Sequence, residues 1–273
     1  MTEPHSHSQG EQESMYIQVL GSGTSMGVPI IGCRCRVCTS TDPRDHRLRT
    51  SVFIRIGQLH LLIDTSSDFR QQMLRAGIDR LDAILFTHHH MDHISGMDDV
   101  RCLNVIHKMA IPIYASEQTM QNIRRVFAHA FDAGNQVSTV PMLIPHLITE
   151  QAFQIQGVRI QPIPLWHGDL PVFGFRIGNF AYCTDVSRIP EPSYRLLEGV
   201  QILILGALRQ RPHPTHFSID QAVAEARKIG ARLTFFTHMT HAISHAETER
   251  ELPEGIFLAY DGLELQLPYR DGP

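Results

Sequence analysis

The sequence predicts a layered α/β fold, and two patterns indicate it. Short apolar segments of strand length are interspersed along the chain with amphipathic segments of helix length, as in sheets covered by helices. Several apolar segments also end in a carboxylate or an imidazole, at Asp64, His88, Asp185 and His238. Because strands that deliver such side chains at their C-terminal ends build a site at one edge of a sheet, we expect a functional site there.

Composition limits the classes of protein that remain. The 273 residues are 42% hydrophobic and 19% charged, which is typical of a globular protein with a sizeable core. The net charge of −4 lacks the basic surplus of proteins that hold long nucleic acids by their backbone, so large nucleic acids are not expected partners. Apolar runs are shorter than the roughly 18 residues of a membrane span, and the N-terminus lacks a secretory signal. A membrane partner is therefore not expected. Five cysteines, an odd number, fit a reducing compartment better than a disulfide framework, so the chain is predicted to be cytoplasmic.

One domain is the simplest organisation. Residues 1–14 are polar, without a periodic apolar pattern, and are predicted to form a disordered tail. Met15 opens the first apolar segment and is a second candidate start. Because no linker, repeat or shift of composition follows, residues 15–273 are expected to fold as a single domain.

The secondary structure follows from local patterns. Strands are predicted for the short apolar segments 16–21, 51–56, 60–64, 82–87, 158–165, 172–177, 180–185, 201–206 and 233–237. Helices are predicted, from apolar residues at helical spacing, over 67–77, 116–131 and 218–230. The last helix is bounded by a capping box of Ser218 and Gln221 and by Gly230 at its end.

The segment FTHHHMDHISGMDD (86–99) carries the strongest chemical signal. It follows the apolar run LDAILF, and His88, His90, Asp92 and His93 form the pattern H-x-H-x-D-H. Imidazole nitrogens and carboxylate oxygens suit Zn, Mn or Fe, and this spacing lets a tight turn direct several ligands at one place. A polar turn that only caps a helix is the competing interpretation. Four potential ligands directly after a buried strand favour the metal site.

Three more candidates lie downstream. His167 follows the strand-like VRIQPIPLW, Asp185 closes FAYCTD and His238 closes LTFFTH. Each alone fits a surface residue or a satisfied core residue, but their order along the chain favours a shared metal site.

This order of motifs resembles the metallo-β-lactamase superfamily over residues 16–265. The resemblance implies an αββα sandwich, two central sheets flanked by helices, with a binuclear metal centre along one edge. It implies one metal held by His88, His90 and His167. It implies a second metal held by Asp92, His93 and His238, with Asp185 bridging the two and Asp64 orienting a ligand from behind.

A second cluster of metal-binding residue types is the C-x-C-x-x-C pattern of Cys33, Cys35 and Cys38. Three thiols cannot all pair in disulfides, and three inert buried cysteines fit poorly beside Arg34 and Arg36. Three thiolates and one histidine would complete a closed structural zinc site. The cysteines alone leave these interpretations open.

The opening GSGTSMGVPIIGCRCRVC resembles the phosphodiesterase branch of the superfamily that is associated with carbon–phosphorus lyase genes. This resemblance implies a structural zinc on the three cysteines and on His241, three residues after the last active-site histidine. Cys102 and Cys183 have no place in the pattern and are expected as small buried hydrophobes. The segment 21–27 is not a dinucleotide-binding loop, because its third glycine is misplaced and no helix is apparent after it.

The implied activity is metal-dependent phosphodiester hydrolysis. Two metals can hold a bridging hydroxide and stabilise the attacking and leaving oxygens of an in-line displacement. The expected cofactors are two Mn or Zn ions, or Fe, in the active site and one structural Zn; the expected substrate is a small, cyclic phosphodiester. The residues expected to act in catalysis are Asp92 and His216. His216 aligns with the branch's histidine near the leaving group, as general acid or substrate contact, whereas His213 is expected to be a bystander.

Other functions stay as alternatives. A tRNA 3′-end processing endonuclease shares the metal motifs but carries a long arm between the third histidine motif and the bridging aspartate, where only a short strand pair separates His167 from Asp185 here. A lactam hydrolase or thioesterase fits the ligands and cysteines less well. A non-catalytic metal- or cofactor-binding protein of the same fold is disfavoured, because structural metal sites are closed. A homodimer is expected only by analogy with relatives.

Overall fold

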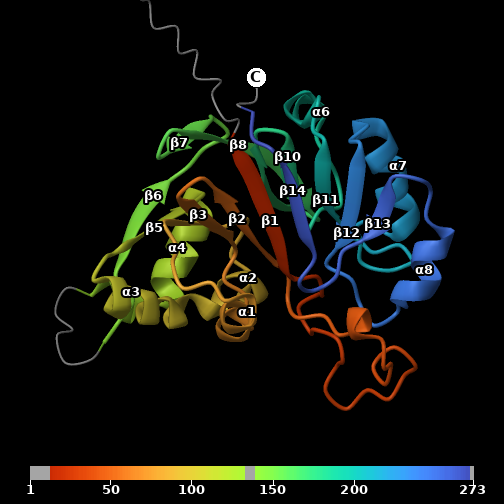
Figure 1. Ribbon diagram of the computed structural model, residues 1–273, viewed down its shortest axis with the longest axis horizontal. Coiled ribbons are helices and arrows are strands. Elements are labelled where there is room, and N and C mark those ends of the chain that lie inside the picture. Colours follow the sequence, from red (N-terminus) through yellow and green to blue (C-terminus); the bar gives the residue numbers. More distant parts are fainter. Residues whose placement is uncertain (1–12, 133–138, 271–273) are drawn as a thin grey trace, which may run out of the picture.

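Two sheets pack face to face in the computed structural model, which describes residues 13–132 and 139–270 (Figure 1). Within these residues the first sheet has the order β14-β1-β2-β3-β4-β5-β6, and the second has the order β13-β12-β11-β10-β9-β8-β7. Helices cover the outer side of each sheet. The predicted αββα sandwich is therefore confirmed.

Both sheets are mixed, and each has a parallel half. In the first sheet, the strands from β3 to β6 are parallel and the others antiparallel. Its strands are β1 (Ser14–Gly21), β2 (Ser51–Ile56), β3 (Leu59–Ile63), β4 (Ala83–Leu85), β5 (Ile111–Ala115), β6 (Leu143–Leu147) and β14 (Glu264–Pro268). Its helices are η1 (Pro43–Asp45), α1 (Phe69–Ala76), α2 (Met91–Ile94), η2 (Ser95–Val100), α3 (Arg101–His107), α4 (Glu117–Val126) and α5 (Ala128–Phe131).

In the second sheet, the strands from β10 to β13 are parallel and those from β7 to β10 antiparallel. Its strands are β7 (Phe153–Ile155), β8 (Val158–His167), β9 (Leu170–Ile177), β10 (Phe180–Cys183), β11 (Ile202–Gly206), β12 (Leu233–Thr237) and β13 (Ile256–Leu258). Its helices are α6 (Glu191–Leu197), α7 (Ile219–Ile229) and α8 (His245–Glu251). Because neighbouring parallel strands share a direction, their C-terminal ends meet at one edge, as the sequence predicted.

Three apolar layers hold these elements together. The inner faces of both sheets form one buried cluster, which includes Ile54 of β2 and Phe175 of β9. A second cluster lies between the first sheet and α1, α3 and α4. A third lies between the second sheet and α6 and α7. Each sheet is thus buried on both faces, which explains why its strands read as nearly continuous apolar runs.

The predicted strands are present, with changes at their ends. β3, β4 and β10 stop before the polar residues that were assigned to them, because Asp64, Thr87 and Asp185 leave the ladder to enter the site. β1 begins at Ser14, so that residue belongs to the sheet; residues 1–12 of the predicted tail lie outside the described residues.

The helix predictions were incomplete. The helix 218–230 has the predicted capping box and ends at Gly230 in the left-handed conformation. The helix 116–131 is interrupted at Phe127 into α4 and α5. The helices α2, α3, α6 and α8 and the strands β5, β6, β7, β13 and β14 were not predicted. Most of these elements are short, and β6 is half exposed, so their apolar patterns are weak.

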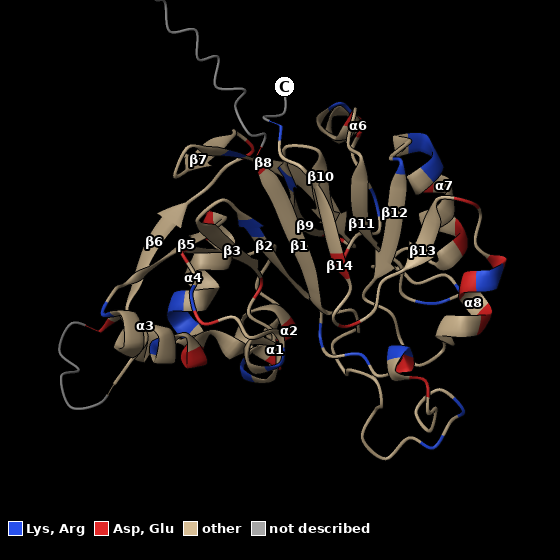
Figure 2. Ribbon diagram, in the orientation of Figure 1, with Lys and Arg blue, Asp and Glu red and all other residues tan. Residues whose placement is uncertain are grey.

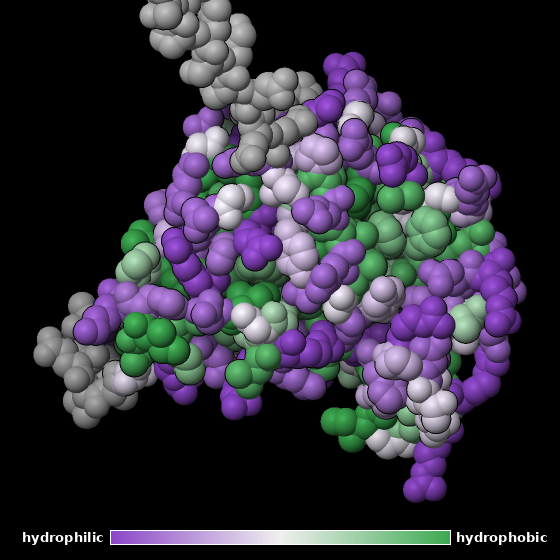
Figure 3. Space-filling model, in the orientation of Figure 1, coloured by the Kyte–Doolittle hydropathy of each residue, from purple (hydrophilic) through white to green (hydrophobic). Residues whose placement is uncertain are grey.

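Two surface properties follow from the fold. Cys102 is exposed, so its prediction as a buried hydrophobe was wrong, whereas Cys183 is buried as expected. Figure 2 shows basic and acidic residues interspersed along the helices, and Figure 3 shows polar residues along the outline with apolar residues mainly over the strands. In the described part of the chain, every helix is too short or too polar to cross a membrane.

The long segment between β1 and β2 is fixed by a buried ion pair. Arg47 Nη2 lies 3.0 Å from Asp45 Oδ1, and the Arg47 side chain is fully buried. Arg47 also donates to the carbonyl of Thr240, and Asp45 accepts from the backbone N–H of His245. Burial lowers the pKa of Arg47, yet its carboxylate partner keeps the charge compensated. This pair therefore ties the segment to the chain that follows β12.

Asp45→Asn should destabilise the protein by about 3 kcal/mol, because it leaves the buried Arg47 charge uncompensated. Urea unfolding followed by circular dichroism measures this change. The control Asp98→Asn weakens partly exposed pairs with Arg101 and His129 and should cost less than about 1 kcal/mol. Equal losses for both variants would contradict a special role for the buried pair.

Candidate metal centre

Three of the predicted site residues follow strands and have a left-handed backbone conformation. Asp64 follows β3 with φ 63°, Asp185 lies just after β10 with φ 50°, and His238 follows β12 with φ 61°. This conformation costs about 1–3 kcal/mol for a residue other than glycine and persists where the surrounding structure fixes it. Its recurrence at the ends of β3, β10 and β12 indicates a functional site at this edge of the sandwich.

Asp64 is a fully buried acceptor at the base of the site. Its carboxylate accepts from the backbone N–H and the hydroxyl of Thr87, both at 2.8 Å, and from His93 Nδ1 at 2.8 Å. Burial raises the pKa of Asp64, while the His93 ring and the Thr87 donors counter that rise. Because Nδ1 of His93 donates here, the other ring nitrogen, Nε2, is directed into the site.

The three histidines predicted for the first metal lie together. The hydroxyl of Thr87 donates its hydrogen to Asp64. The Thr87 oxygen therefore accepts from the N–H at His88 Nδ1, 3.0 Å away, and His88 Nε2 is the unprotonated ring nitrogen with a free lone pair. That nitrogen lies 3.0 Å from His90 Nδ1. His167 Nδ1 donates to the carbonyl of Thr215 at 2.7 Å, and one ligand atom each from His88, His90 and His167 lies within 4.8 Å of the others. Burial holds the pKa of His88 well below its usual range, so its ring is neutral, the form that binds metals.

The residues predicted for the second metal also converge. One ligand atom each from Asp92, His93 and His238 lies within 4.8 Å of the others. Asp185 lies close to residues of both groups. One carboxylate oxygen of Asp185 lies within 4.8 Å of ligand atoms of His88 and His93, and its Oδ2 and Oδ1 lie 3.2 Å from His93 Nε2 and 3.3 Å from His238 Nε2. Burial opposes ionisation of Asp185, but His238 and His93 outweigh it and hold its pKa well below the usual range. The carboxylate is therefore charged and available to both groups.

The donor set fits divalent metals. Nε2 of His93 and both nitrogens of His238 are buried without hydrogen-bond partners among the described residues. His93 Nε2 faces the carboxylates of Asp92 and Asp185 at 3.3 and 3.2 Å. Burial alone would lower the pKa of His93, yet these carboxylates and Asp64 hold it well above its usual range. The surrounding carboxylates thus stabilise a positive charge at His93 Nε2. A bound metal ion would supply that charge in place of a proton.

His216 lies beside the centre and His213 lies one step farther out. The His216 ring stacks on His238, with 4.8 Å between centroids, and its Nδ1 is 3.8 Å from Asp185 Oδ1. Burial, followed by the charge of His238, lowers the pKa of His216 to about 3. His213 Nδ1 accepts from the backbone N–H of Thr215 at 3.3 Å. The geometry gives His216 access to the site and His213 a local structural contact.

Threonines that support the ligands were not singled out from the sequence. Thr87 precedes His88, Thr184 precedes Asp185 and Thr237 precedes His238, so the signal was the repeated pattern T-H, T-D and T-H. Thr184 donates to Asp185 Oδ2 at 2.8 Å, and Thr237 bonds to the hydroxyl of Thr50 at 3.1 Å. These threonines fix the orientation of the site from behind.

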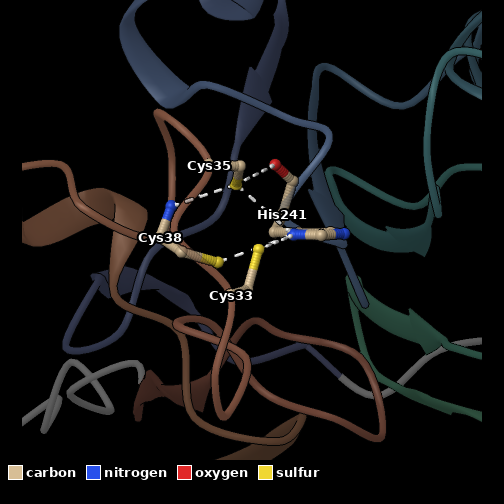
Figure 4. Close-up of side chains that lie close together, drawn as sticks. All are labelled: Cys33, Cys35, Cys38 and His241. Atoms are coloured by element: carbon tan, nitrogen blue, oxygen red, sulfur yellow. Dashed lines mark hydrogen bonds between the residues drawn. The ribbon is translucent and has the colours of Figure 1, made fainter.

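A separate cluster brings Cys33, Cys35 and Cys38 around His241 (Figure 4). Their Sγ atoms lie 3.3, 3.4 and 3.5 Å from His241 Nδ1. A tetrahedral zinc, with Zn–S about 2.3 Å and Zn–N about 2.0 Å, separates such ligands by about 3.5 Å. The backbone N–H of Cys38 donates to Cys35 Sγ at 3.4 Å and lowers the pKa of Cys35 to about 6, whereas burial raises that of Cys38 to about 11. The donor set fits a closed zinc site.

Comparison with known proteins agrees with this geometry. The family model described as a β-lactamase superfamily domain matches residues 60–239. A crystal structure described as a new diphosphatase from the PhnP family has a TM-score of 0.88 and 45% identity, covering 94% of this chain and 98% of that one.

Two curated relatives differ in how much of them the chain covers. An octanoyltransferase of Porphyromonas gingivalis is 39% identical over 249 residues, 90% of this chain, but the chain spans only 50% of that relative. A ribonuclease Z of Mycobacterium bovis is 25% identical over 241 residues, 76% of this chain and 85% of the relative. The family model and the PhnP-family structure each match most of the chain. The names of the two curated relatives, octanoyltransferase and ribonuclease Z, denote different activities. The chain therefore belongs to the metallo-β-lactamase superfamily and, within it, to the PhnP family.

Proposed function

We propose that this chain is a metal-dependent hydrolase of small phosphodiesters, including cyclic ones. The observation that supports this most is that Asp185 lies within 4.8 Å of ligand atoms of both three-residue groups, through His88 of the first and His93 of the second. The names diphosphatase and ribonuclease Z, carried by two of the relatives, both denote cleavage at phosphorus. A centre that joins two groups of nitrogen and oxygen ligands suits this chemistry.

The chain's own residues prepare the site. His88, His90 and His167 would hold one divalent metal, Mn or Zn, and Asp92, His93 and His238 the other, with Asp185 shared. When bound, the metals supply an activated water and neutralise charge on the phosphate. Asp64 fixes the His93 ring and Thr215 fixes the His167 ring, so that each presents Nε2 to the site. The ligand geometry is therefore set before metal or substrate binds.

His216 is assigned to the leaving oxygen. With a pKa of about 3 the ring is neutral at pH 7 and carries one N–H donor. A phosphate anion in the site would stabilise its protonated form, because an adjacent negative charge raises the pKa of an imidazole. His216 would then donate a proton to the departing alkoxide.

Small substrates are favoured over tRNA. His167 and Asp185 are joined only by β9, β10 and two tight turns, without an inserted arm. Charged residues of both signs are interspersed over the visible helices instead of forming one basic face. A ribonuclease Z activity therefore has less support here than hydrolysis of a small diester, although several relatives carry that name.

Asp185→Ala should lower kcat on bis-p-nitrophenyl phosphate at least about 100-fold, because it removes the carboxylate shared by both ligand groups. Steady-state kinetics with Mn- or Zn-loaded protein measure this loss. Asp79→Ala, at an exposed position away from the ligand groups, serves as the matched control and should keep wild-type turnover. An inactive wild-type protein that binds two metals per chain would refute the proposed activity.

His216→Ala should impair poor leaving groups most, because proton donation matters most for an alkoxide. We expect a loss of roughly 100-fold on a dialkyl phosphodiester and less than about tenfold on a p-nitrophenyl ester. His213→Ala is the matched control and should change neither rate appreciably. A uniform loss across leaving groups would argue for substrate contact instead of acid catalysis.

We further propose that Cys33, Cys35, Cys38 and His241 hold a structural zinc. In zinc-free protein, iodoacetamide should label Cys35 with a midpoint near pH 6, because its pKa is lowered and the thiolate forms as pH rises through that value. Cys38, with a pKa of about 11, should stay unlabelled over the same range. Peptide mass spectrometry follows each thiol.

Zinc should block the labelling of Cys35, while the exposed Cys102 should label with or without zinc. A midpoint near the ordinary value of about 8.5, or labelling that zinc does not change, would count against this site.

A further inference from the structure

His238 differs from the other buried ligand rings of the metal centre in how it is held. Among the described residues its Nδ1 is buried without a hydrogen-bond partner. The other buried ligand rings each have a partner at Nδ1, namely those of His88, His93 and His167. The direction of the His238 ring therefore depends on its backbone. The left-handed conformation of that backbone, with φ 61°, persists only where the surrounding structure fixes it.

Three buried hydroxyls form one hydrogen-bond network at the residue before His238. Thr50 Oγ1 lies 3.1 Å from Thr237 Oγ1 and 2.9 Å from the hydroxyl of Tyr182, and all three side chains are buried. We propose that Thr50 and Tyr182 are positioning residues of the metal centre, which hold Thr237 and through it the backbone of His238. The inference rests on the proposed metal ligands and adds residues that act through one of them.

The network joins the two sheets. Thr50 directly precedes β2 of the first sheet, whereas Tyr182 belongs to β10 and Thr237 to β12 of the second. A hydroxyl donates one hydrogen and accepts others, so Thr50 bonds both partners at once. Asp185 and His238 follow β10 and β12. The contact therefore sets the position of these two ligands relative to the ligands that the first sheet supplies.

The backbone is fixed on the other side of His238 as well. Met239, the next residue, donates its N–H to the carbonyl of Ser22 at 3.0 Å and accepts from the N–H of Thr24 at 3.2 Å. These bonds hold the residue after His238, and the Thr50 hydroxyl holds the residue before it. Loss of that hydroxyl should thus free one of the two attachments of the left-handed residue.

Packing alone does not explain the hydroxyl of Tyr182. The side chain belongs to the apolar layer between the sheets, where a phenylalanine would fill the same place without a polar group to satisfy. Its hydroxyl instead bonds to Thr50 Oγ1, the atom that also bonds to Thr237. Tyr182 thereby fixes the direction of the Thr50 hydroxyl, so its effect on His238 passes through Thr50.

Metal binding tests the network without catalysis. With zinc in the cysteine cluster, where thiolates favour zinc over Mn²⁺, titration with Mn²⁺ should fill two sites per wild-type chain. The electron paramagnetic resonance signal of free Mn²⁺ measures this binding. Thr50→Val keeps the shape of the side chain without its hydroxyl and should weaken one site about tenfold, as for other groups that orient metal ligands, with less than about a twofold change at the other. Thr50→Ser keeps the hydroxyl and should bind as the wild type does.

Tyr182→Phe removes the second hydroxyl and should weaken the same site. Because Tyr182 acts through Thr50, the double variant Thr50→Val/Tyr182→Phe should bind Mn²⁺ no more weakly than Thr50→Val alone. Tyr194→Phe is the matched control, since it loses a hydroxyl bond to Glu225 on the outer helices α6 and α7 and should bind Mn²⁺ normally. Tyr182→Phe serves as the test if Thr50→Val does not fold.

Urea unfolding of the metal-free proteins separates positioning from stability. A lower urea midpoint for Thr50→Val with unchanged Mn²⁺ binding would overturn the inference, and so would equal losses of binding in Thr50→Val and Thr50→Ser. Additive losses in the double variant would remove Tyr182 from the network.

The outcomes also separate this inference from the proposed activity. Weaker Mn²⁺ binding by Thr50→Val, in a protein whose wild type hydrolyses no diester, would support the positioning role and refute the phosphodiesterase. Diester hydrolysis by the wild type with unchanged Mn²⁺ binding by Thr50→Val would do the reverse. Fewer than two Mn²⁺ sites in the wild type would overturn the inference together with the ligand groups on which it rests.

Discussion

The Asp64 carboxylate receives three hydrogen bonds in a fully buried position, and the orientation of both ligand groups depends on them. It fixes His93 directly, and it fixes His88 through the hydroxyl of Thr87. One carboxylate at the end of β3 thereby selects the ring nitrogens that two neighbouring segments present. Asp64 need not touch a metal itself. Its contribution is to hold the His88 and His93 rings in the orientation that directs their Nε2 atoms into the site.

The cysteine cluster and the Asp45–Arg47 pair both contact the chain that follows β12. His241 lies three residues after His238, so the chain that leaves β12 carries one residue of each cluster. Arg47 and Asp45 bind the backbone of Thr240 and His245, on both sides of His241. The long segment between β1 and β2 is therefore attached to the chain that follows His238. This attachment explains how a segment with little regular structure stays ordered beside the metal centre.

The sequence made the ligands predictable because their signals are local. H-x-H-x-D-H, the cysteine spacing and the polar strand ends are each visible within a few residues, and the capping box of α7 is too. A cavity beside β8 was not predictable, because it is assembled from five separate stretches of the chain. The exposure of Cys102 was missed for a similar reason: its side of α3 faces solvent, and residue type alone does not show this.

Both sheets of the fold supply residues of the metal centre. Ligands come from the ends of β4, β8, β10 and β12 and from α2, and the buried layers fix the positions of these strands. Residues 164–166 of β8 line the cavity, and β7 pairs only with residues 158–160 of β8. On this edge Trp166 instead exchanges backbone hydrogen bonds with Arg188. Prolines at positions 162 and 164 suit this edge, because they lack the N–H that a paired strand would need. The edge can thus change its side chains without disturbing the ladder, whereas the ligand strands cannot. A family that keeps its metal chemistry while varying its substrates would change residues of this kind first.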